Sequence, residues 1–137
     1  MGRRWRDGRG VLVVGSGVGG GPPETAVAAS VAAPVRVPLE VARSYRARTR
    51  GLLGRDGIEG ALLLTPAGSV HTFGMRFPID VAYLDRGLRV IAVRTMPPGR
   101  LGLPRLRSRF VLEAEAGGMA GWGVRAGVRV RVEMGGE

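Results

Sequence analysis

Asp80 is the residue whose surroundings most directly suggest chemistry. It lies within residues 79–84, where the other side chains on both faces are apolar, so the segment predicts a strand buried on both sides. A carboxylate in such a layer needs a partner, and a guanidinium can meet it with two parallel hydrogen bonds. The obvious donors are Arg50, Arg55 and Arg76. We expect Asp80 to pair with Arg50 or Arg55, either as a structural ion pair that ties a helix to the sheet or as part of a ligand pocket.

His71 is the only imidazole of the chain. Ser69 lies two positions away, about 7 Å along an extended strand, which is too far for a direct hydrogen bond. A triad of Ser69, His71 and Asp80 lacks the glycine-flanked elbow of serine hydrolases, so hydrolysis is an alternative interpretation only. A metal site of His71 with Asp80 or Glu113 has equally little support, and we expect neither a metal nor a cofactor. The simpler expectation for His71 is a position at a pocket rim or against Phe73.

Glu113 and Glu115 alternate with apolar residues in a predicted strand over residues 110–116, so both point to the same side. A pair of carboxylates can perform acid–base chemistry, but glycosidases place the two groups across a cleft rather than on one strand. We expect this pair to face water, balanced by Arg129 or Arg131 on an adjacent strand.

Arg43, Arg46 and Arg50 would share one face of a helix, at the spacing i, i+3 and i+7. Such a face could contact phosphates, which makes nucleic-acid binding the alternative function. Aromatic residues are only 5% of the chain, so stacking platforms for single strands are scarce. We therefore expect a solvated helix face, with nucleic-acid binding that is non-specific, salt-sensitive and in the range of about 10⁻⁴–10⁻⁶ M.

The 137 residues carry a net charge of +10, and all 21 basic residues are Arg. These arginines extend from Arg3 to Arg131, which indicates a diffuse field rather than a concentrated binding face. The absence of Cys excludes disulfides and thiolate metal sites, and one His excludes multi-histidine sites. No apolar run reaches the roughly 20 residues of a transmembrane helix. We expect a cytoplasmic protein.

Residues 1–34 differ from the rest in being rich in Gly and Pro, and we expect a flexible segment with a possible opening strand at 11–14. Residues 15–20 match G-x-G-x-x-G, but Pro22 and Pro23 follow and prevent the helix that a dinucleotide site needs. A short apolar run after the first arginines also makes export the minority alternative. A chain that begins at Val35 should keep most of its fold, unless 11–14 supplies a strand.

Residues 35–134 show the pattern of a β-domain. Alternating apolar residues predict strands, with Pro38 placing the first at an edge or bulge. The expected strands cover residues 35–42, 61–65, 70–75, 79–84, 88–94, 110–116 and 128–134. A helix is expected over 45–53 behind the N-cap Ser44, a hairpin around Asp85-Arg86-Gly87, and a surface loop over 96–107. This order predicts a mainly β fold, an antiparallel β-sandwich or small barrel of jelly-roll type with one short helix.

Several segments together resemble the prokaryotic DUF192 family of small proteins of unknown function. They are Arg-Gly-Leu-Leu-Gly-Arg at 50–55, His-Thr-Phe-Gly-Met-Arg-Phe-Pro-Ile-Asp-Val at 71–81, Val-Leu-Glu at 111–113, Ala-Gly at 116–117 and Gly-Val-Arg-Ala-Gly at 123–127. The resemblance covers about residues 35–133. It implies a compact β-sandwich with one short helix and implies no reaction. Gly74 and Val128 depart from the family, which often has an aromatic residue and an Asp there.

These observations favour a non-enzymatic β-domain that binds a small polar or anionic ligand or a protein partner. Sequence-specific binding to nucleic acid is not expected. The candidate ligand-binding residues are Arg50, Arg55, His71, Met75, Arg76, Asp80 and Glu113.

Overall fold

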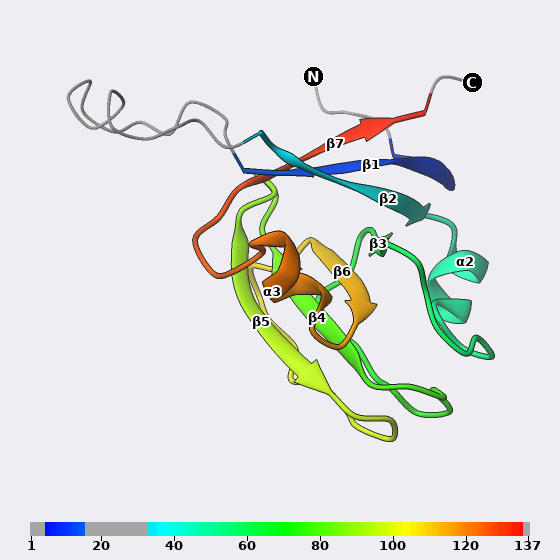
Figure 1. Ribbon diagram of the computed structural model, residues 1–137. Helices are drawn as coiled ribbons and strands as arrows, with labels where there is room; N and C mark the ends of the chain where they lie inside the picture. Colours follow the sequence, from blue (N-terminus) through cyan, green and yellow to red (C-terminus); the bar gives the residue numbers. More distant parts are fainter. Residues whose placement is uncertain (1–4, 16–32, 136–137) are drawn as a thin grey trace.

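The computed structural model describes residues 5–15 and 33–135. Its strands form one seven-stranded sheet in the order β5-β4-β6-β3-β2-β1-β7 (Figure 1). They are β1 (Gly8–Val14), β2 (Val35–Ala42), β3 (Ala61–Leu64), β4 (Ile79–Leu84), β5 (Val90–Met96), β6 (Phe110–Glu115) and β7 (Val130–Met134). All neighbouring strands run antiparallel except β2 and β3, which run parallel. The mainly β prediction is confirmed, although the sheet is mixed and is not closed into a barrel.

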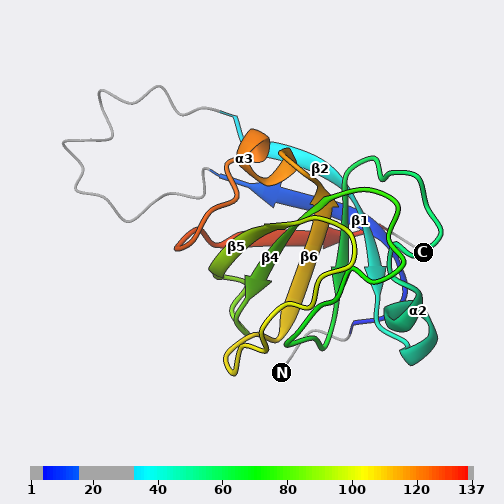
Figure 2. The ribbon, with the colours of Figure 1, turned by 90° about the horizontal axis from the view of Figure 1, so that it is seen from below.

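The sheet curves so that β1, β2 and β7 face β4, β5 and β6 across an apolar core (Figure 2). Leu12 and Val37 meet Leu84 and Leu112 in this first core. A second core covers the opposite face of β3, β4 and β6. The three central strands are therefore buried on both faces along almost their whole length.

The described part of the chain contains two short helices where one was expected, α2 (Tyr45–Arg50) and α3 (Gly118–Trp122). Parallel neighbours need a crossover connection, and α2 lies in the one between β2 and β3. Gly51 has φ 46° and ends α2 before residue 53, the predicted end. The helix α3 occupies the turn after β6, and Figure 2 shows α2 and α3 at opposite ends of the molecule.

The opening strand is longer than residues 11–14 and lies inside the sheet. β1 pairs with β2 from Gly8 to Val14 and with β7 from Gly10 to Val14. A chain that begins at Val35 would therefore lack a strand that has two neighbours. Of the G-x-G-x-x-G segment at residues 15–20, only Gly15 is among the described residues.

Three local predictions differ from the structure. Residues 70–75 form a loop rather than a strand, with one isolated bridge between His71 and Leu101. The turn between β4 and β5 is present, but the left-handed backbone falls on Leu88 (φ 64°) rather than on Gly87. Pro38 lies in an interior strand, where the ladder to β3 begins only at the next residue, so its missing N–H breaks no pairing with β3.

Candidate ligand-binding cleft

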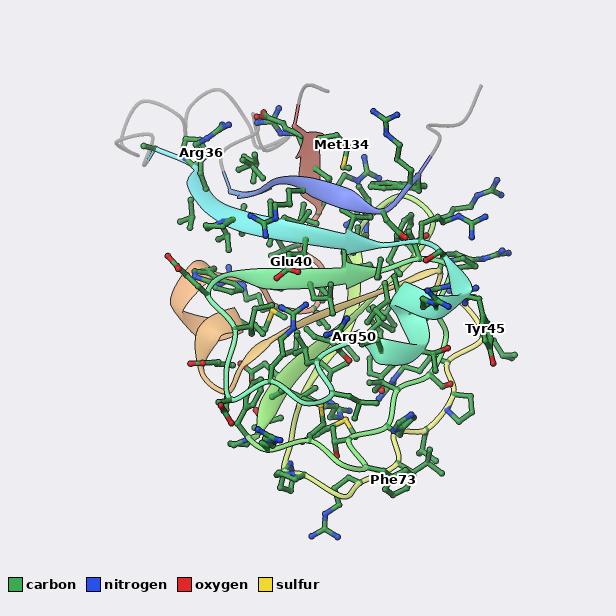
Figure 3. The ribbon with its side chains drawn as sticks, turned by 90° about the vertical axis from the view of Figure 1, so that its right-hand side faces the viewer. Arg36, Glu40, Tyr45, Arg50, Phe73 and Met134 are labelled. Atoms are coloured by element: carbon green, nitrogen blue, oxygen red, sulfur yellow. The ribbon has the colours of Figure 1, made fainter. Side chains whose placement is uncertain are left out.

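A cleft of about 330 Å³ opens between α2, the segment 66–71 and β6. Its walls are largely apolar and include Leu52, Leu64 and Met75. Its polar lining residues are Arg48, Thr49, Arg50, Ser69, His71 and Glu113. Figure 3 shows the side of the molecule that carries α2, with Arg50 toward the sheet and Tyr45 pointing away from it. The cleft combines an apolar interior with a few polar groups, as small-molecule sites do.

The start of α2, which forms one side of the cleft, is held by hydrogen bonds to Asp7, the residue before β1. Ser44 caps the helix by accepting from Ala47 N at 3.1 Å. The Asp7 carboxylate accepts from Arg43 N at 2.6 Å, from Ser44 N at 2.8 Å and from the Ser44 hydroxyl at 2.6 Å. These bonds, above all that from the Ser44 hydroxyl, lower the pKa of Asp7. The sequence analysis missed Asp7, because nothing in the pattern places residue 7 beside residue 44.

The carboxyl group of Glu113 lies in the interior of this cleft. Glu113 is 5% exposed, and burial raises its pKa to about 7. Among the described residues no group donates a hydrogen bond to it. A β-carbon on Gly51 would lie 3.8 Å from Glu113 Oε1, so the end of α2 passes directly over the carboxyl. Glu113 is therefore a buried acid that opens onto the cleft.

The expectation that Glu113 and Glu115 both face water is wrong for Glu113. Only Glu115 is exposed, and it accepts from Ile58 N at 3.1 Å. The expected balance by Arg129 or Arg131 is also absent, because β6 lies between β3 and β4 whereas Arg131 is in β7 beside β1. Sequence alternation placed the two carboxyls on one side but did not reveal that α2 covers only the first.

Asp80 is buried as predicted, at 4% exposure, but it has no arginine partner. Its carboxylate accepts from the Thr95 hydroxyl at 2.6 Å, from Gly117 N at 2.9 Å and from Met119 N at 3.2 Å. The ion pair with Arg50 or Arg55 is therefore wrong. Side chains alternate along β4, so Asp80 points to the face that carries α3, whereas α2 lies over the opposite face.

The predicted arginine donors have other partners or none. Arg55 forms a two-bond ion pair with Glu40, at 2.7 and 3.0 Å, which raises the pKa of Arg55 and lowers that of Glu40. Arg76 pairs with Asp56 at 3.1 Å on the surface. Arg50 makes no ion pair within the described residues. Arg55 and Glu40 line a second, separate groove of about 380 Å³.

The structure thus brings together part of the predicted site. Arg50, His71, Met75 and Glu113 line the cleft, whereas Arg55, Arg76 and Asp80 lie elsewhere. The triad fails because Asp80 is on the opposite face of the sheet from Ser69 and His71. His71 stacks on Phe73 with ring centroids 5.3 Å apart, at the predicted place on the rim. Within the described ranges no cluster of His, Asp and Glu could hold a metal ion.

The basic face predicted on one helix is not formed as expected. Arg43 precedes α2, and Arg50 at its end lines the cleft. The Arg48 side chain is held against the protein, because its guanidinium donates to the carbonyls of Arg43 at 3.1 Å and Pro66 at 3.3 Å. Only Arg43 and Arg46 remain as exposed arginines outside the cleft on this side of α2.

The fold and the cleft define a small, mainly β protein with a ligand-sized cleft over one face of its sheet. The chain belongs to the DUF192 family, described as "Uncharacterized ACR", whose family model matches residues 27–132. The resemblance inferred from the motifs is confirmed. Within the described residues, no helix has the length and apolar character needed to span a membrane.

Relatives with curated names are UPF0127 proteins. One from Pyrococcus horikoshii is 31% identical over 84 residues, which cover 58% of this chain and 73% of that protein. One from Thermococcus kodakarensis is 31% identical over 85 residues, which cover 58% of this chain and 54% of that protein.

Two crystal structures share the fold. A protein of unknown function from Novosphingobium aromaticivorans has a TM-score of 0.68 and 20% identity, covering 89% of this chain and 83% of that one. A protein from Sinorhizobium meliloti 1021, described as a candidate transcription regulator, has a TM-score of 0.70 and 15% identity, covering 95% and 98%. At these identities the likeness establishes the fold alone.

The hydrogen bonds of Asp80 lead to a first prediction. Asp80→Asn turns one acceptor oxygen into a donor that faces the Thr95 hydroxyl or the amides of Gly117 and Met119. Hydrogen bonds to charged groups contribute about 1.5–3 kcal/mol each, so we expect the free energy of unfolding to fall by about 2–3 kcal/mol. The melting temperature should fall by roughly 10 °C in calorimetry.

The control for this variant is Asp56→Asn, which removes the charge of an exposed carboxylate paired with Arg76. Exposed ion pairs contribute little, so its melting temperature should match that of the unmodified protein. Equal melting temperatures for Asp80→Asn and Asp56→Asn would contradict the role assigned to Asp80.

The burial of Glu113 leads to a second prediction, on pH. Its pKa is about 7 in the folded protein against 4.5 as the usual value, so only the unfolded chain loses this proton between those values. The free energy of unfolding should therefore fall as pH rises through this window, by about 3 kcal/mol in total, and then level off. Denaturation of Glu113→Gln at a series of pH values should lack this fall.

Glu115→Gln is the matched control, because Glu115 lies two residues away on the same strand and outside the cleft. It should keep the full decline of stability with pH. The assignment is refuted if Glu113→Gln and Glu115→Gln show the same pH dependence.

Proposed function

We propose that the protein binds a small polar or anionic ligand in the cleft between α2, the segment 66–71 and β6. The observation that carries this proposal is Glu113, an almost fully buried acid that opens onto the cleft and has no hydrogen-bond partner among residues 5–15 and 33–135. Buried polar groups normally have a hydrogen-bond partner, and an exception needs an explanation. A ligand that supplies the missing partner is the explanation we favour.

The lining of the cleft indicates the chemistry of this ligand. Arg50 has no ion pair within the described residues and lines the cleft together with His71. A guanidinium binds carboxylates and phosphates through parallel hydrogen bonds. Leu52 and Met75 provide apolar walls. We therefore propose a ligand with an anionic group for Arg50, a short apolar body and a hydrogen-bonding group that reaches Glu113.

The volume and the residue types favour binding over catalysis. A cleft of about 330 Å³ is at the small end of ligand sites. Ser69 and His71 both line it, but no hydrogen bond among the described residues joins one side chain to the other or to Glu113. A nucleophile and its base lie within hydrogen-bond reach in most enzymes that use them. Hydrolysis stays the alternative, and turnover of a bound ligand would reveal it.

Nucleic-acid binding is the other alternative, and the structure adds little to it. Arg43 and Arg46 are exposed, but Arg48 and Arg50 face protein carbonyls and the cleft respectively. A binding surface for phosphates would need more free arginines on one face. The Sinorhizobium meliloti neighbour does not change this balance, because only its fold is shared.

The ligand proposal predicts which backbone amides will change their chemical shifts on binding. In ¹H–¹⁵N spectra recorded with a panel of small carboxylates, phosphates and amino acids, a binding compound should shift the amides of residues 48–53, 69–71 and 113. Arg50→Gln and Glu113→Gln should each weaken its binding at least about tenfold, since each removes a charged or buried hydrogen-bond partner.

Glu115→Gln serves as the control and should bind as the unmodified protein does. Compounds that bind only at the groove of Arg55 and Glu40, or that bind the Glu113→Gln variant equally well, would overturn the proposal.

A further inference from the structure

The connection between β5 and β6, residues 97–109, exposes an unusual amount of apolar surface. Leu101, Leu103 and Leu106 are 70%, 78% and 102% exposed, and Phe73 is 50% exposed. The bridge between His71 and Leu101 links the segment that carries Phe73 to this connection. Single exposed leucines are ordinary, but three within residues 101–106 of one connection indicate an interaction surface. In Figure 1 the connection begins at the end of the molecule opposite β1 and β7, and it returns along the sheet to the start of β6 beside Leu84.

The connection is held in this shape by hydrogen bonds to the 67–72 segment. The Thr72 hydroxyl donates to Pro97 O at 2.7 Å and accepts from Arg100 N at 2.8 Å. Gly102 N donates to Val70 O at 2.8 Å. Further along, the Ser108 hydroxyl donates to Ala67 O at 2.9 Å. The leucines therefore project from a braced backbone, and the bracing prevents them from folding back onto the core.

The side chain of Arg105, between the exposed leucines, turns inward. The Arg105 guanidinium lies 4.8 Å from the ring centroid of Tyr83, over the aromatic face. Leu106, the next residue, is fully exposed. The arginine is thus half-buried with its Nε atom out of solvent, whereas its apolar neighbour faces solvent, the reverse of what solubility alone favours.

The charge around the leucines restricts the partner. Arg100 and Arg107 are exposed within the connection, and the sequence has no acidic residue from Arg86 to Leu112. A second copy of the chain would bring this basic surface against itself, which like charges disfavour. The partner that fits the charge is anionic.

The shape favours a lipid surface among anionic partners. The leucines project from a loop and line neither the cleft nor the groove of Arg55 and Glu40, so a folded protein would have to provide a matching hollow. A bilayer needs no matching shape, because apolar side chains enter the boundary between headgroups and acyl chains while arginines contact the phosphates. We propose that the 97–107 loop docks the protein onto a membrane surface rich in anionic phospholipid.

The test measures sedimentation of the full chain with vesicles of phosphatidylcholine that contain about 30 mol% phosphatidylglycerol. The combined variant Leu101→Ser, Leu103→Ser and Leu106→Ser should lower the partition coefficient at least about tenfold, because the inserted apolar area is lost. Its melting temperature should be unchanged, since these side chains have no packing to lose. Tyr45→Ser, which removes a 78% exposed apolar side chain from α2, should bind as the unmodified protein does.

A second pair of variants separates local charge from net charge. Arg100→Gln with Arg107→Gln should weaken vesicle binding several-fold, whereas Arg43→Gln with Arg46→Gln removes equal charge from the α2 side and should leave binding within about twofold. Equal loss in the two pairs, or full binding by the leucine variant, would mean diffuse attraction and overturn the proposal. Failure of the unmodified protein to sediment with these vesicles would also overturn it and leave an acidic protein surface as the occupant.

Discussion

The burial of β3, β4 and β6 on both faces constrains every polar residue placed on them. An ionised carboxylate in such a layer must receive hydrogen bonds or give up its charge. Asp80 meets the first condition, with bonds from the Thr95 hydroxyl and from two amides at the start of α3. Glu113, one strand away, receives no hydrogen bond from the described residues, and burial raises its pKa to about 7, which favours the neutral form. The same burial thus gives one carboxylate a full set of hydrogen bonds and leaves the other without a donor among the described residues.

The alternation of side chains across the sheet keeps these two roles apart. Asp80 faces the core that holds α3, and Glu113 faces the side covered by α2. Gly51, which ends α2, lies over the Glu113 carboxyl, and the cleft opens beside it. Binding there would replace solvent next to Glu113 with a ligand group and would leave the anchor at Asp80 undisturbed.

Much of the fold could be predicted from the sequence, because alternation of apolar residues is a local signal. It located β2, β4, β5, β6 and β7, the helix start at Ser44 and the burial of Asp80. It could not reveal that β3 pairs in parallel with β2, since pairing is decided by contacts between distant segments. It also assigned residues 70–75 to a strand, although their hydrogen bonds go to the 97–102 segment.

The residue types at the site could be recognised from the sequence. What each side chain faces could not, because that depends on which distant segment packs over each face of the sheet. That is why Glu113 was expected in water and Asp80 beside an arginine.

The position of β1 has a consequence for how the chain folds. β1 lies near the amino terminus, yet one of its two neighbours is β7, at residues 130–134. Synthesis adds about 5–20 residues each second. The edge of β1 that pairs with β7 therefore stays unpaired until nearly all of these residues have been made. Pairings between such distant segments are slow to form, because the loop between them must close first. Until then the apolar face of β1 and its unpaired amides are open to other chains. The order of strands therefore makes the interval before β7 emerges the time when this protein most depends on assistance against aggregation.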